Sequence, residues 1–581
     1  MTDSAFVPDL VGIDLGTTHS LVAYWHDGAA HLIPNVLGAT LTPSVVSLDA
    51  DGSVLVGAAA RDRLQSHPDR TVASFKRGMG TATRYTLGPQ SFRAEELSAM
   101  VLRALRADVR ARFGRDVDRA VITVPAYFSD AQRAATRNAG LIAGFVEVSL
   151  LNEPTAAALA YGLNEQEDSQ FLVFDFGGGT FDVSILELFS GVMEVRATAG
   201  DNQLGGDDVD ACIERWVMAQ AGLPDVLLRD DRFVSTLKAR CEAAKRALGA
   251  NGSAPVAFRH EQHVIDLTLR AEELERIIQP VLDRLRHPVE TAIRDARIGT
   301  ADLSTVVLAG GSSRLQAVRQ LVTRMFGKFP AASINPDEVV ALGAAVQAGL
   351  KANAAELAER VMTDVCPYTL GIESARQVTA DRLTAGFMSP ILPRNTVVPA
   401  SRVESFHPVH PEQKVIQVRV FQGEARLVKD NILLGQFDVD LPRFSAEHRP
   451  HVDVRFTYDI DGLLEVEATP MLGDRSAGEP RRLVIQNSEE RLSPEQVAER
   501  LQALAELKLH PRERMEMRAL VARAERLFMQ LGREDRERLG TAITRFELDL
   551  DSQDPRRIEQ GAEALQRLVR GIEADSPLGA V

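Results

Sequence analysis

The sequence predicts a multidomain protein in which an α/β domain is followed by an antiparallel β-sandwich and then by a helical bundle. Three successive patterns carry this prediction. Short β-branched runs alternate with amphipathic helical stretches up to about residue 350. The hydrophobic period then becomes two, and from Ser493 onward it becomes helical again. The predicted boundaries are 8–350 for the α/β domain, 351–365 for a linker, 366–489 for the sandwich and 490–581 for the helices.

Composition limits the class of protein. A chain of 581 residues is too long for one hydrophobic core, which agrees with several domains. A net charge of -15 argues against a nucleic-acid partner, because phosphate backbones require a basic surface. Three scattered cysteines, Cys212, Cys241 and Cys366, suit neither a disulfide framework nor a zinc site, and they favour a reducing compartment.

The sequence gives no reason to expect export or a membrane partner. The first residues lack the basic stretch and apolar core of a signal peptide. No run approaches the roughly 18 apolar residues that are needed to span a bilayer. We therefore expect a soluble, cytoplasmic protein.

Several elements of the first domain are predicted directly from apolar patterns. Strands are expected at 11–14, 120–124, 171–174 and 305–308. A helix is expected at 94–113, because apolar residues recur there at helical spacing. Its stripe consists of Leu97, Val101, Leu102, Leu105 and Val109.

The later domains are predicted from a change of period. Val452, Val454 and Phe456 alternate with Asp453 and Arg455, as in a strand with one buried face. Several such runs separated by Gly, Pro and Asp turns indicate an antiparallel sandwich. The helical stripe of the last part consists of Met517, Leu520, Val521, Ala524, Leu527, Phe528 and Leu531.

An internal repeat lies within the first domain. Residues 11–23 and 172–184 each form an apolar strand that ends in Asp-x-Gly, followed by a Gly/Thr turn and a second apolar strand. This duplication predicts two similar lobes that face each other across a cleft.

The Gly/Thr turns could bind phosphate, because glycine lets backbone N–H groups approach an anion closely. Asp14 and Asp175 occupy matching places in the two hairpins and would together hold a hydrated Mg²⁺. The alternative interpretation is two ordinary hairpins with solvated aspartates. A third glycine turn, Gly310-Gly311 with Ser312 at a helix start, favours the nucleotide site.

Two other phosphate-binding motifs are incomplete or absent. Asp175-Phe-Gly copies the metal motif of protein kinases, but the His-Arg-Asp loop and the Val-Ala-Ile-Lys strand are missing. The sequence contains no Gly-x-x-x-x-Gly-Lys-Ser/Thr loop, which excludes a P-loop NTPase.

Longer phrases extend over nearly the whole chain. They are Gly12-Ile-Asp-Leu-Gly-Thr-Thr, Val124-Pro-Ala-Tyr-Phe-Ser-Asp-Ala-Gln-Arg, Asn152-Glu-Pro-Thr-Ala-Ala-Ala-Leu-Ala-Tyr-Gly, Asp175-Phe-Gly-Gly-Gly-Thr-Phe-Asp, Asn335-Pro-Asp-Glu and Gly343-Ala-Ala-Val-Gln-Ala. Together they resemble the signatures of the heat-shock protein 70 (DnaK-type) chaperone family. The short C-terminus and Cys366-Pro-Tyr-Thr-Leu-Gly-Ile look most similar to its short-lid, HscC-like bacterial branch.

The resemblance implies an actin-like, two-lobed ATPase domain that uses ATP and ADP, with Mg²⁺ held by Asp14 and Asp175 and with K⁺ as a further candidate cation. Lys76 would lie beside the γ-phosphate and Glu153 would orient the attacking water. Thr180 and Asp182 would assist them. The implied nucleotide contacts are Gly16, Thr17, Thr18, His19, Gly177, Gly178, Gly179, Gly206, Glu242, Lys245, Arg246, Gly310, Gly311, Ser312, Arg314 and Asp337.

The resemblance also implies an ATP-dependent chaperone that binds extended apolar segments of unfolded proteins, with its affinity switched by hydrolysis and exchange. The sandwich would be the peptide-binding domain and the helices a lid. Alternating aliphatic residues usually face a core, and this remains the alternative for the implied peptide contacts, which are Met388, Phe406, Ile416 and Val418. Pro125, Arg133 and Asp364 would couple the domains.

Several positions depart from the family pattern. His19 follows the two threonines where most relatives carry another polar residue, and Gly249 replaces a common serine. The linker reads Val361-Met-Thr-Asp in place of a leucine run, so weaker coupling is expected. Ser149 replaces an arginine that meets J-domain cochaperones, so such a partner would be a dedicated one. The short hairpin at 249–266 weakens the case for an exchange factor.

Two other functions remain open at this stage. A nucleotide-dependent holdase with weak or partner-specific coupling would suit the altered linker and Ser149. A sugar kinase on the same duplicated fold would suit the repeat, but the sandwich and the lid argue against it.

Overall fold

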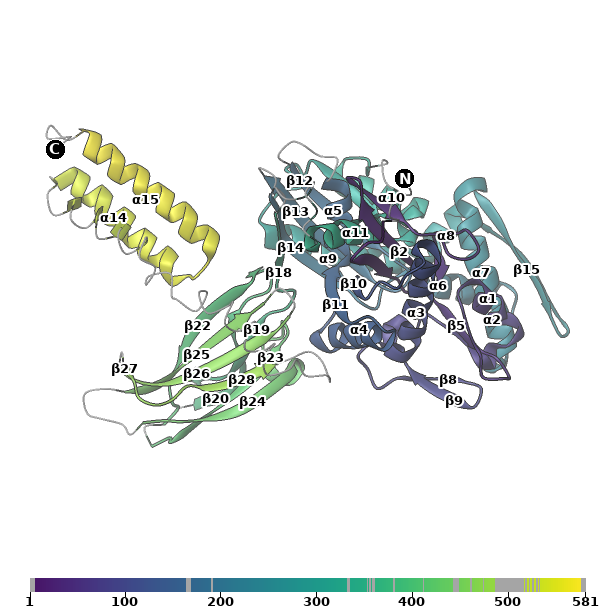
Figure 1. Ribbon diagram of the computed structural model, residues 1–581, viewed down its shortest axis with the longest axis horizontal. Coiled ribbons are helices and arrows are strands. Elements are labelled where there is room, and N and C mark those ends of the chain that lie inside the picture. The colour runs from purple at the N-terminus through teal and green to yellow at the C-terminus, as the bar shows by residue number, and fades with distance from the viewer. Residues whose placement is uncertain are drawn as a thin grey trace. The chain divides into compact units, whose positions relative to one another are not determined.

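The computed structural model describes residues 6–575, except for 163–168, 190–191, 332–334, 353, 355–356, 358–360, 380–381, 411, 443–448, 460–461, 474, 486–516, 518–519, 522, 525–526, 529–530 and 532. The chain divides between Pro367 and Tyr368 into two compact units (Figure 1). The predicted start of the helical part at Ser493 lies outside the described residues.

The first unit contains two large sheets, and the first of them is built around the first repeat. Its strands are β1 (Val11–Leu15), β2 (His19–His26), β3 (Ala29–Leu32), β4 (Thr42–Pro43), β10 (Arg119–Val124) and β11 (Glu147–Asn152). Their order is β11-β10-β1-β2-β3, with β4 paired to β2. β1 and β2 form an antiparallel hairpin, whereas β10 runs parallel to β1 and to β11.

Helices and small sheets complete this half of the unit. α3 (Ala94–Phe113) confirms the helix expected at 94–113, and its apolar stripe is buried. It contacts α4 (Asp130–Ile142) and the 3₁₀ turn η2 (Phe75–Gly78). The remaining elements are β5 (Val45–Leu48), β6 (Val54–Val56), α1 (Ala58–Arg61), α2 (Arg63–Ser66), η1 (Pro68–Arg70), β7 (Thr71–Ala73), β8 (Arg84–Leu87) and β9 (Gln90–Arg93).

The second sheet repeats this arrangement around the second hairpin. Its strands in the first unit are β12 (Ser169–Phe176), β13 (Phe181–Phe189), β14 (Val192–Asp201), β17 (Thr305–Ala309) and β18 (Val361–Val365). β12 and β13 are antiparallel, and β17 runs parallel to β12 as β10 does to β1. The linker segment β18 extends the sheet by pairing in parallel with β14.

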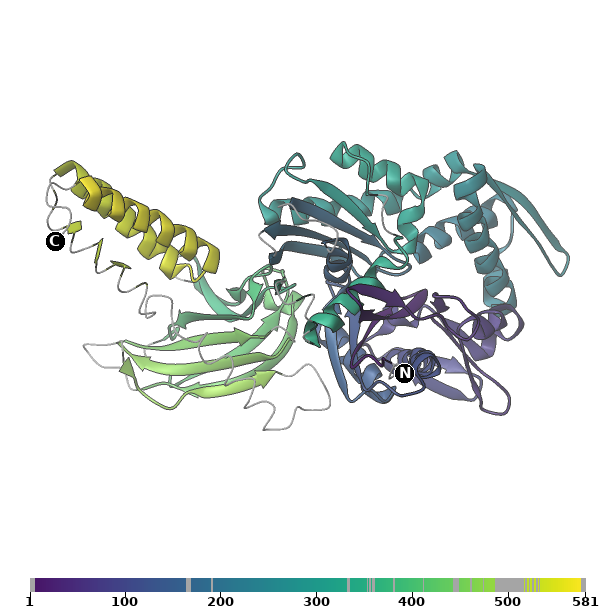
Figure 2. The ribbon, with the colours of Figure 1, turned by 45° about the horizontal axis from the view of Figure 1, so that its top comes forward.

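The remaining helices of the first unit follow in chain order (Figure 2), and all but the first and the last of them contribute residues to the core of this second sheet. They are α5 (Glu153–Gly162), α6 (Gly206–Gln220), α7 (Asp231–Asn251), α8 (Ala271–Ile277), α9 (Gln279–Ala296), α10 (Gln316–Phe326) and α11 (Val339–Lys351), with the turns η3 (Asp225–Arg229) and η4 (Gly311–Arg314). β15 (Ser253–His260) and β16 (His263–Arg270) form a separate hairpin.

Two helices join the halves. α11 packs on β1 and β2, α5 packs on β12 and β13, and the two helices contact each other. Gly343 makes this crossing possible, because a Cβ there would lie 1.6 Å from the backbone oxygen of Ala156. Each half otherwise has its own hydrophobic core, one containing Ile13 and Phe75 and the other Phe174 and Ile213.

The second unit begins with two antiparallel sheets. One has the order β20-β19-β23-β24 and the other β22-β25-β26-β27, with β28 also paired to β26. The runs of period two predicted for this region are therefore strands. The bounds are β19 (Leu370–Thr379), β20 (Arg382–Leu392), β21 (Val397–Val398), β22 (Ala400–Phe406), β23 (Val415–Gln422), η6 (Val428–Asp430), β24 (Ile432–Asp440), β25 (Pro450–Tyr458), β26 (Leu464–Leu472), β27 (Arg475–Ser476) and β28 (Arg481–Ile485).

The second unit ends in a helical hairpin of α14 (Arg533–Asp551) and α15 (Pro555–Asp575), which lie side by side (Figures 1 and 2). The predicted stripe from Met517 to Leu531 packs into the same apolar cluster as Leu539 and Leu565. Among the described helices, none combines the length and the hydropathy that crossing a membrane requires.

Candidate functional site: a cleft between two glycine turns

A cavity of about 1650 Å³ lies between the two halves of the first unit. It brings together, from eight separate stretches of chain, most of the residues predicted for nucleotide and metal. The predicted residues in its lining are Asp14, Gly16, Thr17, Thr18, His19, Lys76, Glu153, Asp175, Gly177, Gly178, Thr180, Gly206, Glu242, Lys245, Arg246, Gly310, Gly311, Ser312, Arg314 and Asp337.

The two glycine turns of the repeat meet inside this cavity. A Cβ on Gly178 would lie 1.9 Å from Thr18 Oγ1, so the second turn approaches the first at contact distance. Gly16 has a similar reason to be glycine, since a Cβ there would lie 2.0 Å from the His19 carbonyl oxygen. Both turns also line the cavity, so their backbone N–H groups are available to an anion bound there.

A lysine and a glutamate form a buried ion pair in the cleft. Lys76 comes from η2 and Glu153 is the first residue of α5. Lys76 Nζ donates to Glu153 Oε1 at 2.6 Å, and both side chains are buried. An ammonium held in this way can stabilise negative charge that develops on a phosphoryl group, and the carboxylate can orient a water molecule.

Three further carboxylates make the cleft strongly acidic. Burial and then Glu153 raise the pKa of Asp14 to about 7 and hold the pKa of Asp175 well above its usual range. Burial and Glu153 also raise the pKa of Asp182 to about 8. Lys76 opposes these shifts without cancelling them, so the cleft favours an additional cation.

Asp14 and Asp175 fit the role predicted for them as ligands of Mg²⁺. This ion takes one or two carboxylates and completes its shell with water and phosphate oxygens. Among the described residues, no three His, Cys, Asp or Glu side chains converge as a metal site. Two acidic side chains in the lining of one cavity are a donor set that suits hydrated Mg²⁺.

Two predicted residues lie outside the cavity lining. Gly179 is adjacent to it, since a Cβ there would lie 2.8 Å from Thr17 Oγ1. Asp182 is buried next to the cleft, where its Oδ1 accepts a hydrogen bond of 3.2 Å from the backbone N–H of Tyr127. Tyr127 follows the predicted strand at 120–124, but its contact with Asp182 is not visible in the sequence.

Charged residues of α7 line the far side of the cavity. Arg246 pairs with Glu242 at 2.6 Å, and Lys245 pairs with Asp210 at 2.7 Å. The sequence analysis missed Asp210, which is buried on α6 and whose pKa burial raises to about 6. Arg314, which also lines the cavity, pairs with Asp337 at 2.6 Å.

His19 is neutral in this setting. Burial, followed by the nearby Arg246 guanidinium, lowers its pKa to about 4. Its imidazole can therefore donate a single hydrogen bond at neutral pH, as the polar residue that it replaces could.

The predicted coupling residues lie next to the cleft. An Arg133 guanidinium nitrogen donates to Asn152 Oδ1, and Asn152 Nδ2 donates to Asp364 Oδ2 at 2.8 Å. Pro125 caps the turn after β10, where its carbonyl accepts the Phe128 N–H. The sequence analysis missed Asn152 as a participant, although Asn152 directly precedes Glu153 in the quoted motif.

The four predicted peptide contacts lie in the second unit and differ in exposure. Met388 is 6% exposed and packs with Phe421 and Val428, and Val418 is fully buried. Phe406 and Ile416 are partly exposed near the ends of β22 and β23. Their contact with peptide stays a prediction.

Comparison with known proteins agrees with the geometry. The family model described as "Hsp70 protein" matches residues 10–87 and 83–575. The chain is 39% identical over 535 residues to the chaperone protein DnaK of Mycoplasmopsis agalactiae, covering 90% of this chain and 86% of the relative. It is 38% identical to the chaperone protein DnaK of Thermotoga neapolitana (82% and 80% covered) and of Mycoplasmopsis pulmonis (90% and 86%). Since the match extends over almost its whole length, the chain belongs to the Hsp70 family.

Proposed function

We propose that this protein is an ATP-dependent molecular chaperone, in which an ATPase with actin-like lobes controls the binding of extended apolar peptide segments. The observation that carries the proposal is the buried Lys76–Glu153 pair between two facing glycine turns. The resemblance of the chain to several chaperone proteins named DnaK supports it.

The proposed hydrolysis depends on position and charge. Backbone groups of Gly16–Thr18 and Gly177–Gly179 would bind the phosphates, and Lys76 would neutralise charge near the γ-phosphate. Glu153 would orient the attacking water, with Thr180 and Asp182 nearby. Asp14 and Asp175 would hold Mg²⁺, which supplies charge neutralisation at the phosphate oxygens when bound; K⁺ remains a second candidate cation.

We propose that the two sheets of the second unit form a sandwich that holds the peptide, with the terminal helices as its lid. Support comes from the turn between α14 and α15. Gln553 there accepts from the Val403 N–H at 3.2 Å and donates to the Val403 carbonyl at 3.0 Å, which anchors the helical hairpin on β22. Phe406, three residues further along that strand, would contact the peptide.

Coupling is proposed through the linker strand. β18 carries Asp364, which reaches Arg133 through Asn152, and Asn152 adjoins Glu153. Undocking of β18 from β14 would therefore remove a partner from the residue next to the proposed water-orienting carboxylate. A change in the second unit that moves the linker would thus alter the contacts of Asn152, next to Glu153 of the ATPase site.

One observation favours the holdase alternative. Thr363 on β18 has a buried hydroxyl oxygen without a hydrogen-bond partner in the described structure. An unsatisfied buried hydroxyl costs about 1–3 kcal/mol, so docking of this linker is weakened. The linker departure seen in the sequence therefore has a physical consequence at this position.

A cytoplasmic location, a place in the HscC-like branch and a dedicated J-domain cochaperone remain predictions. Ser149 bears on the last of these. Ser149 is buried, and its hydroxyl accepts a hydrogen bond of 2.8 Å from Lys351 Nζ. A partner would therefore meet no charged side chain of residue 149.

Single-turnover ATP hydrolysis tests the proposal, with and without an extended apolar peptide, for wild type, Lys76→Ala and the exposed-lysine control Lys429→Ala. We expect slow hydrolysis that peptide accelerates, and a loss of roughly 100-fold or more in Lys76→Ala alone. Hydrolysis that ignores peptide in wild type, but responds to it in Thr363→Val, would favour the weakly coupled holdase. Absence of hydrolysis in wild type would refute the ATPase.

A further inference from the structure

An ion pair joins the two halves of the first unit beside Lys76. Arg77 belongs to η2, whose neighbours Phe75 and Met79 are buried in the core of the first sheet. Its partners stand at the start of α6, whose Val209 and Ile213 belong to the core of the second sheet. A contact between these two segments therefore depends on how the halves are placed across the cleft.

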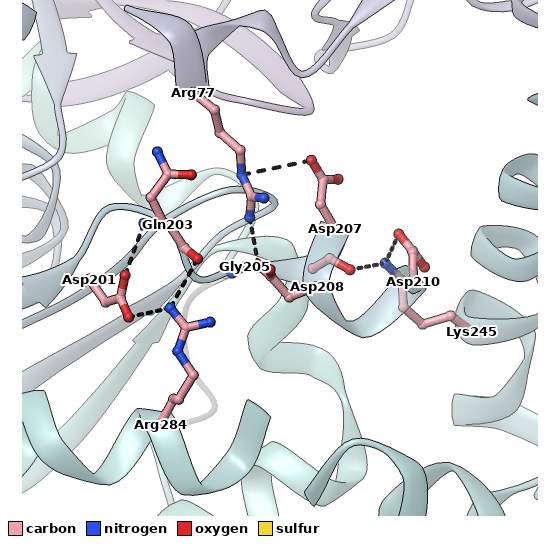
Figure 3. Close-up of polar contacts among 10 residues, drawn as sticks. Arg77, Asp201, Gln203, Gly205, Asp207, Asp208, Asp210, Lys245 and Arg284 are labelled. Carbon is pink, nitrogen blue, oxygen red and sulfur yellow. Dashed lines mark hydrogen bonds and ion pairs between the residues drawn. The ribbon is translucent and has the colours of Figure 1, made fainter. Parts of the chain in front are cut away.

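The pair has good geometry and is partly shielded from solvent. Arg77 Nη2 lies 2.6 Å from Asp208 Oδ2, and Arg77 Nε lies 3.9 Å from Asp207 Oδ2 (Figure 3). The exposed fractions of the three side chains are 22% for Arg77, 26% for Asp208 and 18% for Asp207. Such charge-assisted contacts are stronger than those of fully exposed ion pairs.

The start of α6, which carries Asp207 and Asp208, is hydrogen-bonded to the second glycine turn. Asp208 Oδ2 also accepts the Gly205 N–H at 2.8 Å, which caps the helix. The backbone N–H groups of Gly206 and Asp207 donate to the carbonyls of Gly177 and Gly178 at 3.0 and 2.8 Å. Arg77 itself lies against this turn, since a Cβ on Gly179 would be 3.0 Å from its Nε.

The turn that carries Arg77 is short and strained. It follows Ser74, which has φ of +56°, a left-handed conformation that is unfavourable for a residue other than glycine. Two consecutive side chains of the turn hold it to two different helices. Lys76 points to Glu153, and Arg77 points to α6.

We propose that Arg77 is a positioning residue, which holds Lys76 in its working place only when the halves have closed on nucleotide. When the cleft opens, Arg77 loses Asp207 and Asp208 and the strained turn loses one of its two tethers. Closure would then switch on hydrolysis and retain ADP through the same ion pair. The inference rests on the proposed ATPase and adds a residue to it.

A double-mutant cycle tests the pair, using Arg77→Gln, Asp208→Asn and the double variant. Asparagine can still accept the Gly205 N–H, so the helix cap is kept while the charge is removed. Single-turnover hydrolysis, KM for ATP and the rate of ADP release are measured for each. Each single variant should slow hydrolysis roughly tenfold and speed ADP release by a similar factor, and the double variant should be no worse than either.

A second pair in Figure 3 provides the matched control. Arg284 and Asp201 also lie 2.6 Å apart, but both belong to the second half and do not cross the cleft. Arg284→Gln should leave hydrolysis and ADP release within about twofold of wild type. An equal effect from this control would show a general loss of stability and overturn the inference, as melting temperatures would confirm.

The cycle separates the inference from the proposed function. Additive losses would mean that Arg77 acts without Asp208, for instance by direct contact with phosphate through its buried, unbonded Nε, and would overturn the positioning role. Rates of hydrolysis and ADP release in Arg77→Gln that equal those of wild type would also overturn the positioning role. The proposed ATPase function would still stand in that case, provided that wild type hydrolyses ATP. If wild type itself does not hydrolyse ATP, the proposed function fails first.

Discussion

Lys76 Nζ lies 2.6 Å from Glu153 Oε1, with 3% and 9% of the two side chains exposed. These residues are 77 positions apart and come from different elements, η2 and α5. A pair buried to this degree loses most of its hydration, so removing one member leaves the other charged group without compensation. Stability and catalysis can therefore be separated at this position.

We predict that Lys76→Met destabilises the first unit by about 3–5 kcal/mol, because it removes the cation that lies among Glu153 and three buried aspartates. The double variant Lys76→Met/Glu153→Leu should recover part of that loss. Hydrolysis should remain absent in both. Urea unfolding followed by tryptophan fluorescence reports on this unit, since Trp25 and Trp216 both lie within it. A double variant as unstable as Lys76→Met would show that the pair is not the source of the effect.

The acidic cleft is expected to make the first unit less stable when its carboxylates are ionised and no cation is bound. The pKa of Asp14 is about 7 in the folded protein against 3.8 in the unfolded chain, so between these values the folded state binds more protons. Without a cation, stability should fall by about 1.4 kcal/mol per pH unit for this group as pH rises through that window. Asp14→Asn should remove the share of this dependence that Asp14 contributes, leaving that of Asp175 and Asp182, and should melt higher than wild type at pH 8.

The same variant should lose the benefit of Mg²⁺. Wild type should melt higher with ADP and Mg²⁺ than with ADP and a chelator, and Asp14→Asn should show no such increment. Asp108→Asn is the matched control, because burial raises the pKa of Asp108 to about 6 on α3, outside the cavity lining. It should relieve a similar pH effect and keep the Mg²⁺ increment. Loss of the increment in both variants would contradict the assignment of Asp14.

Much of the cleft could be predicted because its parts are local. The strand, glycine turn and strand of each repeat are continuous in sequence, and their duplication indicates that the turns face each other. Gly178 and Thr18 do meet, at a separation of 160 residues along the chain. The resemblance to a known family then supplied Lys76 and Glu153, which no local pattern distinguishes from a solvated lysine and a helix N-terminal glutamate.

The missed residues share a physical cause. Asn152, Asp210 and Arg77 act through partners 35 to 212 positions away, at contacts that exist only after two elements pack. A period of two likewise shows that Val418 and Ile416 share a face of β23, but it does not show that Val418 is covered while Ile416 remains partly exposed. Contacts that form only in the folded unit determine that difference.

His19 predicts a pH dependence of opposite sign to that of Asp14. Its pKa is about 4 when folded and 6.5 when unfolded, so below pH 6.5 the unfolded chain binds more protons. Relative to His19→Gln, wild type should lose about 1.4 kcal/mol of stability per pH unit as pH falls from 6.5 towards 4. Urea unfolding of both proteins across this range measures the difference. A difference that is constant with pH would place the imidazole in contact with solvent.

Gly343 predicts the largest effect of a single added methyl group. Its Cβ would lie 1.6 Å from the Ala156 carbonyl oxygen, a backbone atom of α5 that cannot rotate away, so α5 and α11 would have to separate. Gly343→Ala should therefore destabilise the first unit by about 3 kcal/mol or more, despite the better helix propensity of alanine. Gly571→Ala on α15 is the control, because no atom lies within 4 Å of its added Cβ, and it should stabilise its helix by up to about 1 kcal/mol.

Since α5 begins at Glu153 and α11 packs on the strand that carries Asp14, any folded Gly343→Ala protein should also hydrolyse ATP more slowly, whereas Gly571→Ala should not. Unchanged unfolding and hydrolysis in Gly343→Ala would mean that the two helices cross further apart than the structure shows.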